Sequence, residues 1–262
     1  MSLDAAASPS ALVPAHALRV PVVGIGASAG GLEALLSVLG QVPRHSGLAF
    51  AVVQHLDPQH KAMLAPLLQR ATTMTVHEAV AGQRIEADQV YVIPPNKTMT
   101  VEQGLLRLTA PAEPRGLRRP IDALFESLAD DYADRAVAVV LSGMASDGTT
   151  GLKAIRARGG LTLAQQPESA QFDSMPRSAI AAGCVDIVCE ASEMPGRILA
   201  ELRARRVLPA TRGSDGTPAK GVATAVDGTA EAPSAQDASV SAALNAVLEL
   251  LHARGKHDFR RY

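Results

Sequence analysis

Aromatic residues are scarce in this sequence: they make up 3% of the 262 residues, and tryptophan is absent. Stacking on bases or sugars is therefore not expected to be the main mode of ligand binding. The formal net charge of −1 gives no electrostatic reason to expect binding to nucleic acid or to a membrane surface.

Long hydrophobic runs and a secretory signal are also missing. No apolar run approaches the roughly 18–20 residues of a membrane span, and residues 1–17 lack a basic segment followed by an apolar one. The two cysteines, Cys184 and Cys189, are an odd number of residues apart along a predicted strand, which places them on opposite faces. A disulfide between them is not expected, and two thiols alone make no zinc site. We expect a cytoplasmic protein without membrane insertion.

Short apolar runs alternate with helical patterns from residue 20 onward, and hydrophobic residues make up 47% of the chain. Near-continuous apolar strands that alternate with helices predict an α/β fold, doubly wound, with a mainly parallel sheet and helices on both faces. Residues 98–101 and 105–109 predict an inserted β-hairpin. The predicted strands cover residues 20–24, 48–54, 75–79, 90–93, 136–142, 161–164 and 185–189, and the predicted helices cover residues 31–39, 58–71, 121–132, 151–157, 176–182 and 194–205.

Composition divides the chain into four segments. Residues 1–19, rich in Ala, Ser and Pro, are expected to form a disordered leader, and residues 20–207 hold the α/β domain. Residues 208–239 contain almost no large apolar groups, which is typical of a flexible linker. Residues 240–262 return to a helical spacing of apolar side chains, and a single amphipathic helix cannot bury its own apolar stripe. We interpret this last segment as the start of a second domain.

Residues 22–32 join an apolar run to five small residues around Ser28 and then to an amphipathic segment. This pattern predicts a strand, a tight turn and a helix. Ser28 would lie at the helix N-terminus, where free N–H groups and the helix dipole favour an anion or a developing oxyanion. Two interpretations are open at this point: a phosphate cradle, or a turn that carries a nucleophile.

The dinucleotide-binding alternative can be tested in the sequence itself. Gly24 and Gly26 fit its fingerprint, but the next glycine is Gly30, which gives G-x-G-x-x-x-G in place of G-x-G-x-x-G. The second strand ends in Gln54 and His55 where an acid would bind the ribose, and there is no Walker lysine. No cofactor is therefore expected. A G-x-S-x-G elbow is present, but the order Ser…His…Asp differs from the α/β-hydrolase order and implies another fold family.

Three polar side chains follow strands of the predicted sheet at their carboxyl ends. Ser28 follows the first strand, His55 ends the second, and Asp147 lies in the loop after a later one. Because these ends meet at one edge of a parallel sheet, we expect a triad: Ser28 attacks, His55 takes its proton and Asp147 holds the imidazole tautomer. Each residue also has a structural interpretation. Ser28 would be a helix cap or a phosphate ligand, His55 a hydrogen-bonded residue at the rim of the sheet, and Asp147 a turn residue.

A metal site is a further alternative, because Asp57 and His60 would complete it with His55. Asp57 serves better as a helix cap, however, and no metal is expected.

Five separated motifs occur in order over about residues 20–202. They read Gly-Ala-Ser-Ala-Gly-Gly-Leu-Glu-Ala-Leu, Val-Val-Gln-His-Leu, Val-Tyr-Val-Ile-Pro-Pro-Asn-Lys, Leu-Ser-Gly-Met-Ala-Ser-Asp-Gly-Thr-Thr-Gly and Phe-Asp-Ser-Met-Pro-Arg-Ser-Ala. Together they resemble the chemotaxis protein-glutamate methylesterases, the CheB-type catalytic domain. The resemblance implies a doubly wound α/β domain that hydrolyses γ-glutamyl methyl esters on the cytoplasmic helices of chemoreceptors and releases methanol. It also implies deamidation of receptor glutamines by the same acyl-enzyme chemistry.

By motif position, the resemblance implies the same three side chains as the triad. It further implies that the backbone N–H of the loop around Met144 helps to form the oxyanion hole, and we expect the N–H of Ala29 to be the second donor. Many family members have threonine in place of Ala29 and glycine in place of Ala145. The missing threonine hydroxyl bears on substrate positioning and leaves the backbone donors intact.

The last residues, Leu-Leu-His-Ala-Arg-Gly-Lys-His-Asp-Phe-Arg-Arg-Tyr, resemble the opening helix of the CheR-type receptor methyltransferase N-terminal domain. This resemblance implies that the chain is the N-terminal piece of an esterase–linker–methyltransferase fusion. About twenty residues precede the first predicted strand, too few for a receiver domain. Gating by receiver phosphorylation is therefore not expected to be built into this chain.

Two other classes of function stand beside the esterase. One is a regulatory or docking module that keeps the fold without turnover, and the other is a nucleotide-binding domain that NAD(P) or ATP would stabilise. Arg115, Arg118 and Arg119 are candidates for docking an acidic receptor helix, although a solvated loop is the simpler explanation.

Overall fold

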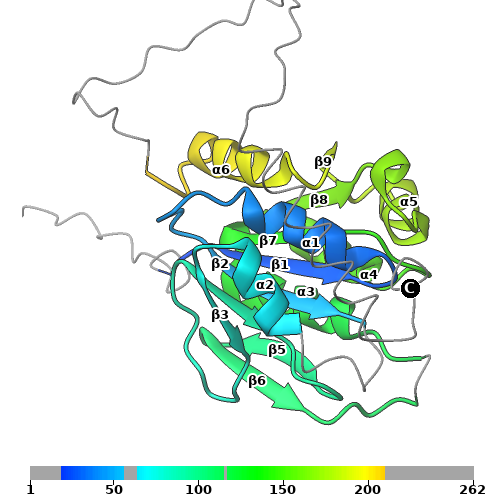
Figure 1. The fold of residues 1–262 in the computed structure, drawn as a ribbon, viewed down its shortest axis with the longest axis horizontal. Helices are drawn as coiled ribbons and strands as arrows, with labels where there is room; N and C mark the ends of the chain where they lie inside the picture. Colours follow the sequence, from blue (N-terminus) through cyan, green and yellow to red (C-terminus); the bar gives the residue numbers. More distant parts are fainter. Residues whose placement is uncertain (1–18, 56–63, 115–116, 210–262) are drawn as a thin grey trace, which may run out of the picture. The chain divides into compact units, whose positions relative to one another are not determined.

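The computed structural model describes residues 19–55, 64–114 and 117–209, which contain a seven-stranded sheet (Figure 1). Its strands are β1 (Val22–Ala27), β2 (Ala49–Gln54), β3 (Thr75–Glu78), β4 (Gln89–Val92), β7 (Ala136–Val140), β8 (Leu161–Gln165) and β9 (Ile187–Cys189). They lie in the order β3-β4-β2-β1-β7-β8-β9, and every neighbouring pair is parallel. From β1 the chain continues to β2, then to the edge strand β3 and back to β4 between them, whereas from β7 it continues outward to β8 and β9 on the other side. The strand order therefore reverses between β1 and β7. The predicted doubly wound parallel fold is confirmed.

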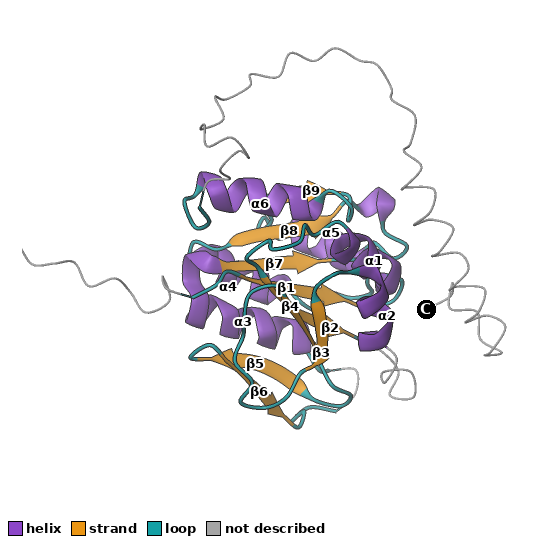
Figure 2. Ribbon diagram, turned by 60° about the vertical axis from the view of Figure 1, so that its left-hand side comes forward, coloured by secondary structure: helices purple, strands orange, loops and turns teal. Residues whose placement is uncertain are grey.

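Helices cover both faces of the sheet (Figure 2). They are α1 (Gly31–Gly40), α2 (Leu64–Ala71), α3 (Pro120–Tyr132), α4 (Thr149–Ala157), α5 (Ser174–Ala181) and α6 (Met194–Ala204), with short 3-10 turns η3 (Ala133–Arg135) and η4 (Pro167–Ser169). Side chains of α1, α2 and α6 join the hydrophobic core on one face, and those of α3, α4 and α5 join the core on the other.

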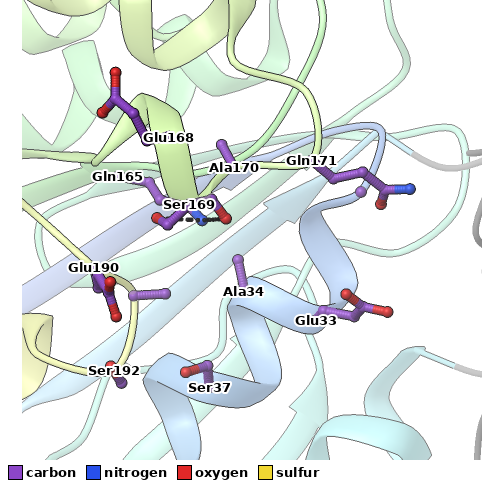
Figure 3. Close-up of a pocket in the computed structure, with 12 residues that line it drawn as sticks. Glu33, Ala34, Ser37, Gln165, Glu168, Ser169, Ala170, Gln171, Glu190 and Ser192 are labelled. Atoms are coloured by element: carbon purple, nitrogen blue, oxygen red, sulfur yellow. Dashed lines mark hydrogen bonds between the residues drawn. The ribbon is translucent and has the colours of Figure 1, made fainter.

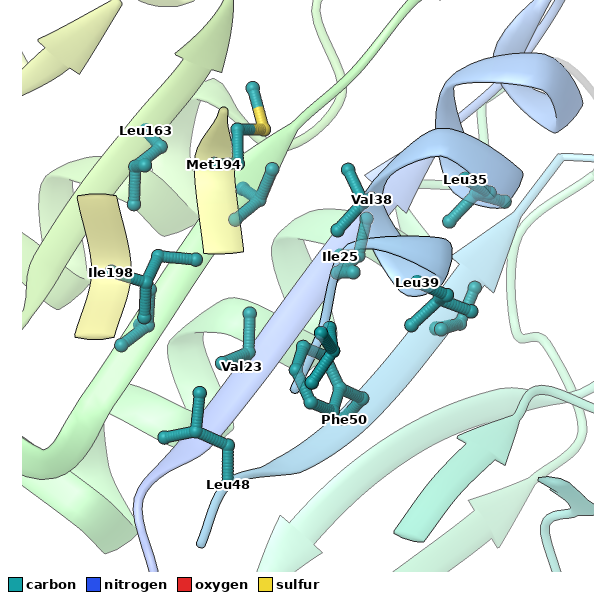
Figure 4. Close-up of a cluster of buried hydrophobic side chains, with 14 of the residues drawn as sticks. Val23, Ile25, Leu35, Val38, Leu39, Leu48, Phe50, Leu163, Met194 and Ile198 are labelled. Atoms are coloured by element: carbon teal, nitrogen blue, oxygen red, sulfur yellow. The ribbon is translucent and has the colours of Figure 1, made fainter. Parts of the chain in front are cut away.

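The core on the α1 face shows why the sequence pattern predicts this arrangement (Figure 4). Leu35, Val38 and Leu39 of α1 are fully buried and recur at helical spacing, while Val23 and Ile25 point to the same face from alternate positions of β1. Fully burying a side chain of this kind stabilises the fold by about 1.5–3 kcal/mol. The apolar periodicity therefore fixes which face of each element turns inward.

Strand β1 extends to Ala27, three residues beyond the predicted end at residue 24, and it pairs with both β2 and β7. Gly24 and Gly26 lie within the strand and not in a phosphate-binding turn. A Cβ at Gly24 would lie 2.7 Å from a methyl group of Leu128, and a Cβ at Gly26 would clash with Ile121. These two glycines therefore permit close packing of α3, and the turn itself begins only at Ser28.

The predicted hairpin is confirmed as β5 (Thr98–Glu102) and β6 (Leu105–Thr109), which pair antiparallel. Met99 and Leu106 are buried in the core on the α3 face. The hairpin turn is fastened to the end of α3, because Asp131 accepts hydrogen bonds from the backbone N–H groups of Gln103 and Gly104 at 3.0 and 2.7 Å.

Cys184 and Cys189 are both free and buried. Cys184 belongs to the core on the α3 face and Cys189 to the core on the α1 face. The predicted opposite placement, without a disulfide, is confirmed. Burial raises the pKa of each thiol, which disfavours the reactive thiolate.

Several predicted element ends were wrong. Helices α4 and α5 each begin two residues earlier than predicted, and β9 begins two residues later, at Ile187. Of the predicted helix 58–71 the structure describes α2, and the predicted cap Asp57 lies outside the described residues. The predicted linker and the terminal helix, apart from residues 208 and 209, also lie outside them, so the domain boundaries stay predictions.

In the part of the chain that is described, no helix combines the length and the apolar character needed to cross a bilayer.

Candidate active site

The predicted triad lies where the strand order reverses, at the carboxyl end of β1. This position in an open parallel sheet is the usual place for a ligand or a reacting group. Ala27 and Gln54 are register partners in β1 and β2, so Ser28 and His55 are the next residues on adjacent strands. The N–H of His55 donates to the Ala27 carbonyl at 2.9 Å, and the N–H of Ser28 donates to the Ser142 carbonyl after β7 at 3.0 Å. Three loops thus meet around Ser28.

His55 and Asp147 form the contact expected of a triad. The Nε2 atom of His55 lies 2.8 Å from Oδ2 of Asp147, with exposed fractions of 33% and 7% for the two side chains. With the carboxylate as acceptor, the ring proton is on Nε2, and Nδ1 is left as the base. Ser28 and His55, both in the described part of the chain, form no side-chain hydrogen bond, so the triad is assembled here only at its His55–Asp147 contact.

Asp147 has a second role that the sequence pattern did not reveal. Its carboxylate accepts hydrogen bonds from the backbone N–H groups of Ile121 and Asp122, at 3.1 and 3.0 Å. These are the first N–H groups of α3, which begins at Pro120 and has no side-chain cap from the preceding Arg119. Exposed N–H groups and the helix dipole stabilise a negative charge at this point. The sequence holds one signal for this contact. Arg119, the residue before α3, cannot cap the helix, so the first N–H groups of α3 need an acceptor from elsewhere in the chain.

Asp122 lies next to this carboxylate and is itself buried, with an exposed fraction of 4%. It accepts a hydrogen bond from the Gly151 N–H at 2.9 Å and lies 3.4 Å from Arg119. Burial raises the pKa of Asp122, the neighbouring charge of Asp147 adds to the increase, and the Gly151 N–H opposes it. The folded protein therefore holds two buried carboxyl groups side by side at the starts of α3 and α4.

We expect Asp122→Asn to remove a pH-dependent loss of stability. Because the pKa of Asp122 is higher in the folded than in the unfolded state, the folded state binds more protons between the two values, and stability falls as pH rises through that interval. Asparagine does not titrate, and its amide oxygen still accepts from Gly151. The variant should therefore gain melting temperature relative to the native chain at pH 7 and lose that advantage near pH 3.5. A difference that is constant over this range would contradict the expectation.

The two predicted oxyanion donors belong to adjoining loops. The carbonyl of Ala29 accepts a hydrogen bond from the Ser142 hydroxyl at 2.9 Å, which ties the turn after Ser28 to the loop that carries Met144. Met144 itself is 60% exposed at the rim. Ala145 has a φ of 65°, the left-handed conformation that favours glycine. The geometry explains why glycine suits this position in the family that the sequence resembles.

Gly143 is the point at which these loops are packed most tightly. Its N–H donates to the Phe172 carbonyl at 2.9 Å, and its own carbonyl accepts from the Met175 N–H at 3.0 Å. A Cβ at this position would clash with the sulfur of Met175 and lie 2.8 Å from the Cβ of Ser28. A side chain at Gly143 therefore cannot be added without moving Ser28 or the start of α5.

We expect Gly143→Ala to destabilise the fold by about 1–3 kcal/mol, the usual range for overpacking, and to lower activity beyond the fraction that unfolds. Gly196, within α6, is the matched control because a Cβ there meets nothing within 4 Å. Gly196→Ala should be neutral or stabilising by about 0.5–1 kcal/mol. Chemical denaturation and ester hydrolysis measured on both variants test the expectation, and equal behaviour of the two would contradict it.

A cavity of about 460 Å³ opens beside Gly30, at the start of α1 (Figure 3). Glu33, Glu168 and Glu190 line it from α1, η4 and the end of β9. A nearby cation, Arg177, is exposed and lies 3.6 Å from Glu168. Three carboxylates around one cavity repel a phosphate group. This cavity is therefore unsuited to a phosphate group.

Other candidates from the sequence lie elsewhere or are otherwise engaged. Within residues 19–55, 64–114 and 117–209, no group of three His, Cys, Asp or Glu side chains is placed to hold a metal ion. The metal candidates Asp57 and His60 lie outside those residues, and so does Arg115. Arg118 donates to the Glu113 carbonyl and to the Asn96 side chain at 2.8 and 2.9 Å. That side chain therefore connects the segment before α3 to the loop between β4 and β5.

Comparisons with known proteins show what the chain is similar to. The family model described as CheB methylesterase matches residues 23–198. A protein of Desulfotalea psychrophila named protein-glutamate methylesterase/protein-glutamine glutaminase is 33% identical over 187 residues, which are 69% of this chain and 51% of the relative. An uncharacterized 104.1 kDa protein of Rhodobacter capsulatus is 51% identical over 123 residues, 47% of this chain and 13% of the relative. The chain thus spans about half the length of the first relative and much less of the second.

A solved structure shares the fold. The crystal structure of the Thermotoga maritima CheB methylesterase catalytic domain matches with a TM-score of 0.65 and 28% sequence identity. The match covers 70% of this chain and all of that domain. The described sheet and its helices therefore correspond to one complete catalytic domain of this type.

Proposed function

The chain belongs to the CheB methylesterase family, and we propose on that premise that it is a serine hydrolase that removes γ-glutamyl methyl esters from chemoreceptor proteins and releases methanol. The observation that carries the proposal is the 2.8 Å contact between His55 Nε2 and Asp147 Oδ2, at the end of the strand that leads to Ser28. Signal adaptation in chemotaxis is the process in which such an activity acts.

The proposed mechanism assigns one task to each group. The Ser28 Oγ attacks the ester carbonyl carbon while His55 Nδ1 takes its proton, and Asp147 holds the Nε2–H and stabilises the charged ring. The N–H groups of Ala29 and Met144 are proposed to receive the oxyanion. The intermediate then expels methoxide, which takes the proton from His55 and leaves as methanol. Water, activated by the same histidine, hydrolyses the acyl-enzyme and restores Ser28.

The same steps would deamidate a receptor glutamine, with ammonia as the leaving group. The relative from Desulfotalea psychrophila carries both activities in its name, which supports including this second reaction in the proposal. The acyl-enzyme formed from either substrate is identical, so one triad serves both reactions.

We further propose that the substrate is the cytoplasmic part of a chemoreceptor and that the chain acts in the cytoplasm. The terminal segment 240–262 is proposed to begin a CheR-type methyltransferase domain in a longer protein. That a relative of 104.1 kDa matches this chain over only 13% of its length supports the occurrence of such domains within long chains.

The test is the release of labelled methanol from methylated chemoreceptor membranes, with Ser28→Ala as the control. Release that the variant lacks would support the esterase. No release from the native chain, on several receptors, would contradict it and leave a docking module as the better account. Thermal stabilisation by NAD(P) or ATP would point instead to a nucleotide-binding domain.

A further inference from the structure

Gln54 ends β2 immediately before His55, and its side chain crosses to the nucleophile turn. It is buried, with an exposed fraction of 4%, and its Nε2 donates to the Ser28 carbonyl oxygen at 2.7 Å. The N–H of Gly31 donates to the same oxygen at 3.0 Å. Two donors from different elements therefore hold the carbonyl of the nucleophile residue.

The orientation of this carbonyl determines the orientation of the next N–H. In a planar trans peptide the Ser28 C=O and the Ala29 N–H point in opposite directions. Holding the oxygen toward Gln54 therefore directs the Ala29 N–H away from β2. The following carbonyl, that of Ala29, is held by the Ser142 hydroxyl. Both peptide planes after the nucleophile are thus anchored by buried polar side chains.

The Oε1 atom of the Gln54 amide indicates that this residue is not there to stabilise the fold. Its Oε1 is buried and has no hydrogen-bond partner in the described part of the chain. Turning the amide over would place Oε1 against the Ser28 carbonyl oxygen, so the observed orientation is the one that hydrogen bonding allows. A buried amide oxygen without a donor destabilises a fold. The Oε1 end of Gln54 therefore lowers the stability of the fold, whereas the Nε2 end holds the Ser28 carbonyl in place.

We propose that Gln54 is a positioning residue that aims the Ala29 N–H at the developing oxyanion. The inference rests on the proposed function, in which Ala29 supplies one of the two oxyanion donors. Gln54 does not touch the reacting atoms, and it acts through the Ser28–Ala29 peptide. An apolar side chain of the same length should then preserve the fold and weaken catalysis.

The first test compares Gln54→Met with Gln69→Met. Gln69 is the matched control because its Nε2 donates to the Met74 carbonyl at 2.9 Å and its Oε1 accepts from Val76, away from the triad. Gln54→Met should lower kcat by about 10- to 100-fold, less than the roughly 10²–10³-fold cost of removing an oxyanion donor. Its KM should stay within about twofold of the native value, because ground-state binding is unchanged, and its melting temperature should not fall. Gln69→Met should lose melting temperature and keep kcat.

A second variant, Gln54→Glu, tests the hydrogen bond by pH. The introduced carboxyl group can donate to the Ser28 carbonyl only when protonated, and burial favours the protonated form. The ratio of kcat of the variant to kcat of the native chain should therefore rise as pH falls from 8 to 5. A residue that only fills space would give a ratio independent of pH.

The measurement that separates this inference from the proposed function is acylation of Ser28 by p-nitrophenyl acetate, followed as a burst of p-nitrophenol. An equal burst rate constant for the native chain and Gln54→Met overturns the inference, whatever the natural substrate is. A burst that Gln54→Met slows, together with no methanol release from receptors, upholds the inference and overturns the proposed substrate. Absence of Ser28 acylation in the native chain, together with no methanol release from receptors, overturns both.

Discussion

Replacing Ser28 by alanine is expected to abolish methanol release, with a loss in kcat on the order of 10⁶-fold, the scale found when a triad nucleophile is removed. The reason is that the substitution removes the attacking oxygen, and the buried serine of the site cannot replace it. Ser142, the nearest buried serine, is 1% exposed and uses its hydroxyl to hold the Ala29 carbonyl and the Phe172 N–H. The variant should keep the melting temperature of the native chain, because the change removes one oxygen atom at the end of a strand.

Ser146 supplies the control for this prediction. It lies in the loop after β7, next to Asp147, and its carbonyl accepts from the Thr149 N–H at 3.2 Å. Ser146→Ala should keep the activity of the native chain within about threefold, since its hydroxyl has no assigned role. If Ser28→Ala retained more than a tenth of the native activity, the nucleophile would have to lie elsewhere. The triad assignment would then be wrong.

The parts of the fold that follow from local pattern were predictable from the sequence. Apolar runs such as those of β2 and β7 are buried on both faces, which is typical of a parallel sheet covered by helices. The strand-end positions of Ser28 and His55 follow directly from that topology. The length of β1 could not be predicted, because Gly24 and Gly26 look like turn residues in the sequence. Their place within the strand is explained only by the close packing of α3 against them.

The supporting interactions of the site could not be predicted because they join distant parts of the chain. The residues in the bond from Gln54 to Ser28 are 26 positions apart, and those in the bond from the Ser142 hydroxyl to Ala29 are 113 positions apart. Glutamine and serine at strand ends are common, and no spacing rule distinguishes these two. The same holds for Asp147, which looks like an ordinary residue of an Asp-Gly turn until α3 is placed against it.

Asp147→Asn is expected to lower kcat by about 10⁴-fold, the loss found when the carboxylate of a triad becomes an amide. The carboxylate accepts from three donors: His55 Nε2, the Ile121 N–H and the Asp122 N–H. An asparagine has one acceptor oxygen and a donor NH₂ group in place of the second. Oδ2 accepts from both His55 and Ile121, so an NH₂ group in its place reverses the tautomer and also leaves the Ile121 N–H without its acceptor. An NH₂ group in place of Oδ1 leaves the Asp122 N–H without its acceptor. A buried donor without its acceptor costs about 1–3 kcal/mol of stability.

Asp131→Asn is the control that separates the two proposed roles of Asp147, because Asp131 also accepts from two backbone N–H groups and lies outside the proposed triad. Its carboxylate accepts from two backbone N–H groups, those of Gln103 and Gly104, and pairs with Arg19. We expect Asp131→Asn to lower the melting temperature and leave kcat unchanged, whereas Asp147→Asn lowers both. If the activity of Asp147→Asn fell only in proportion to the fraction unfolded, the residue would be a helix cap and the His55 contact would be incidental. A loss of kcat in fully folded protein would instead mean that one carboxylate both anchors α3 and sets the tautomer of the catalytic base.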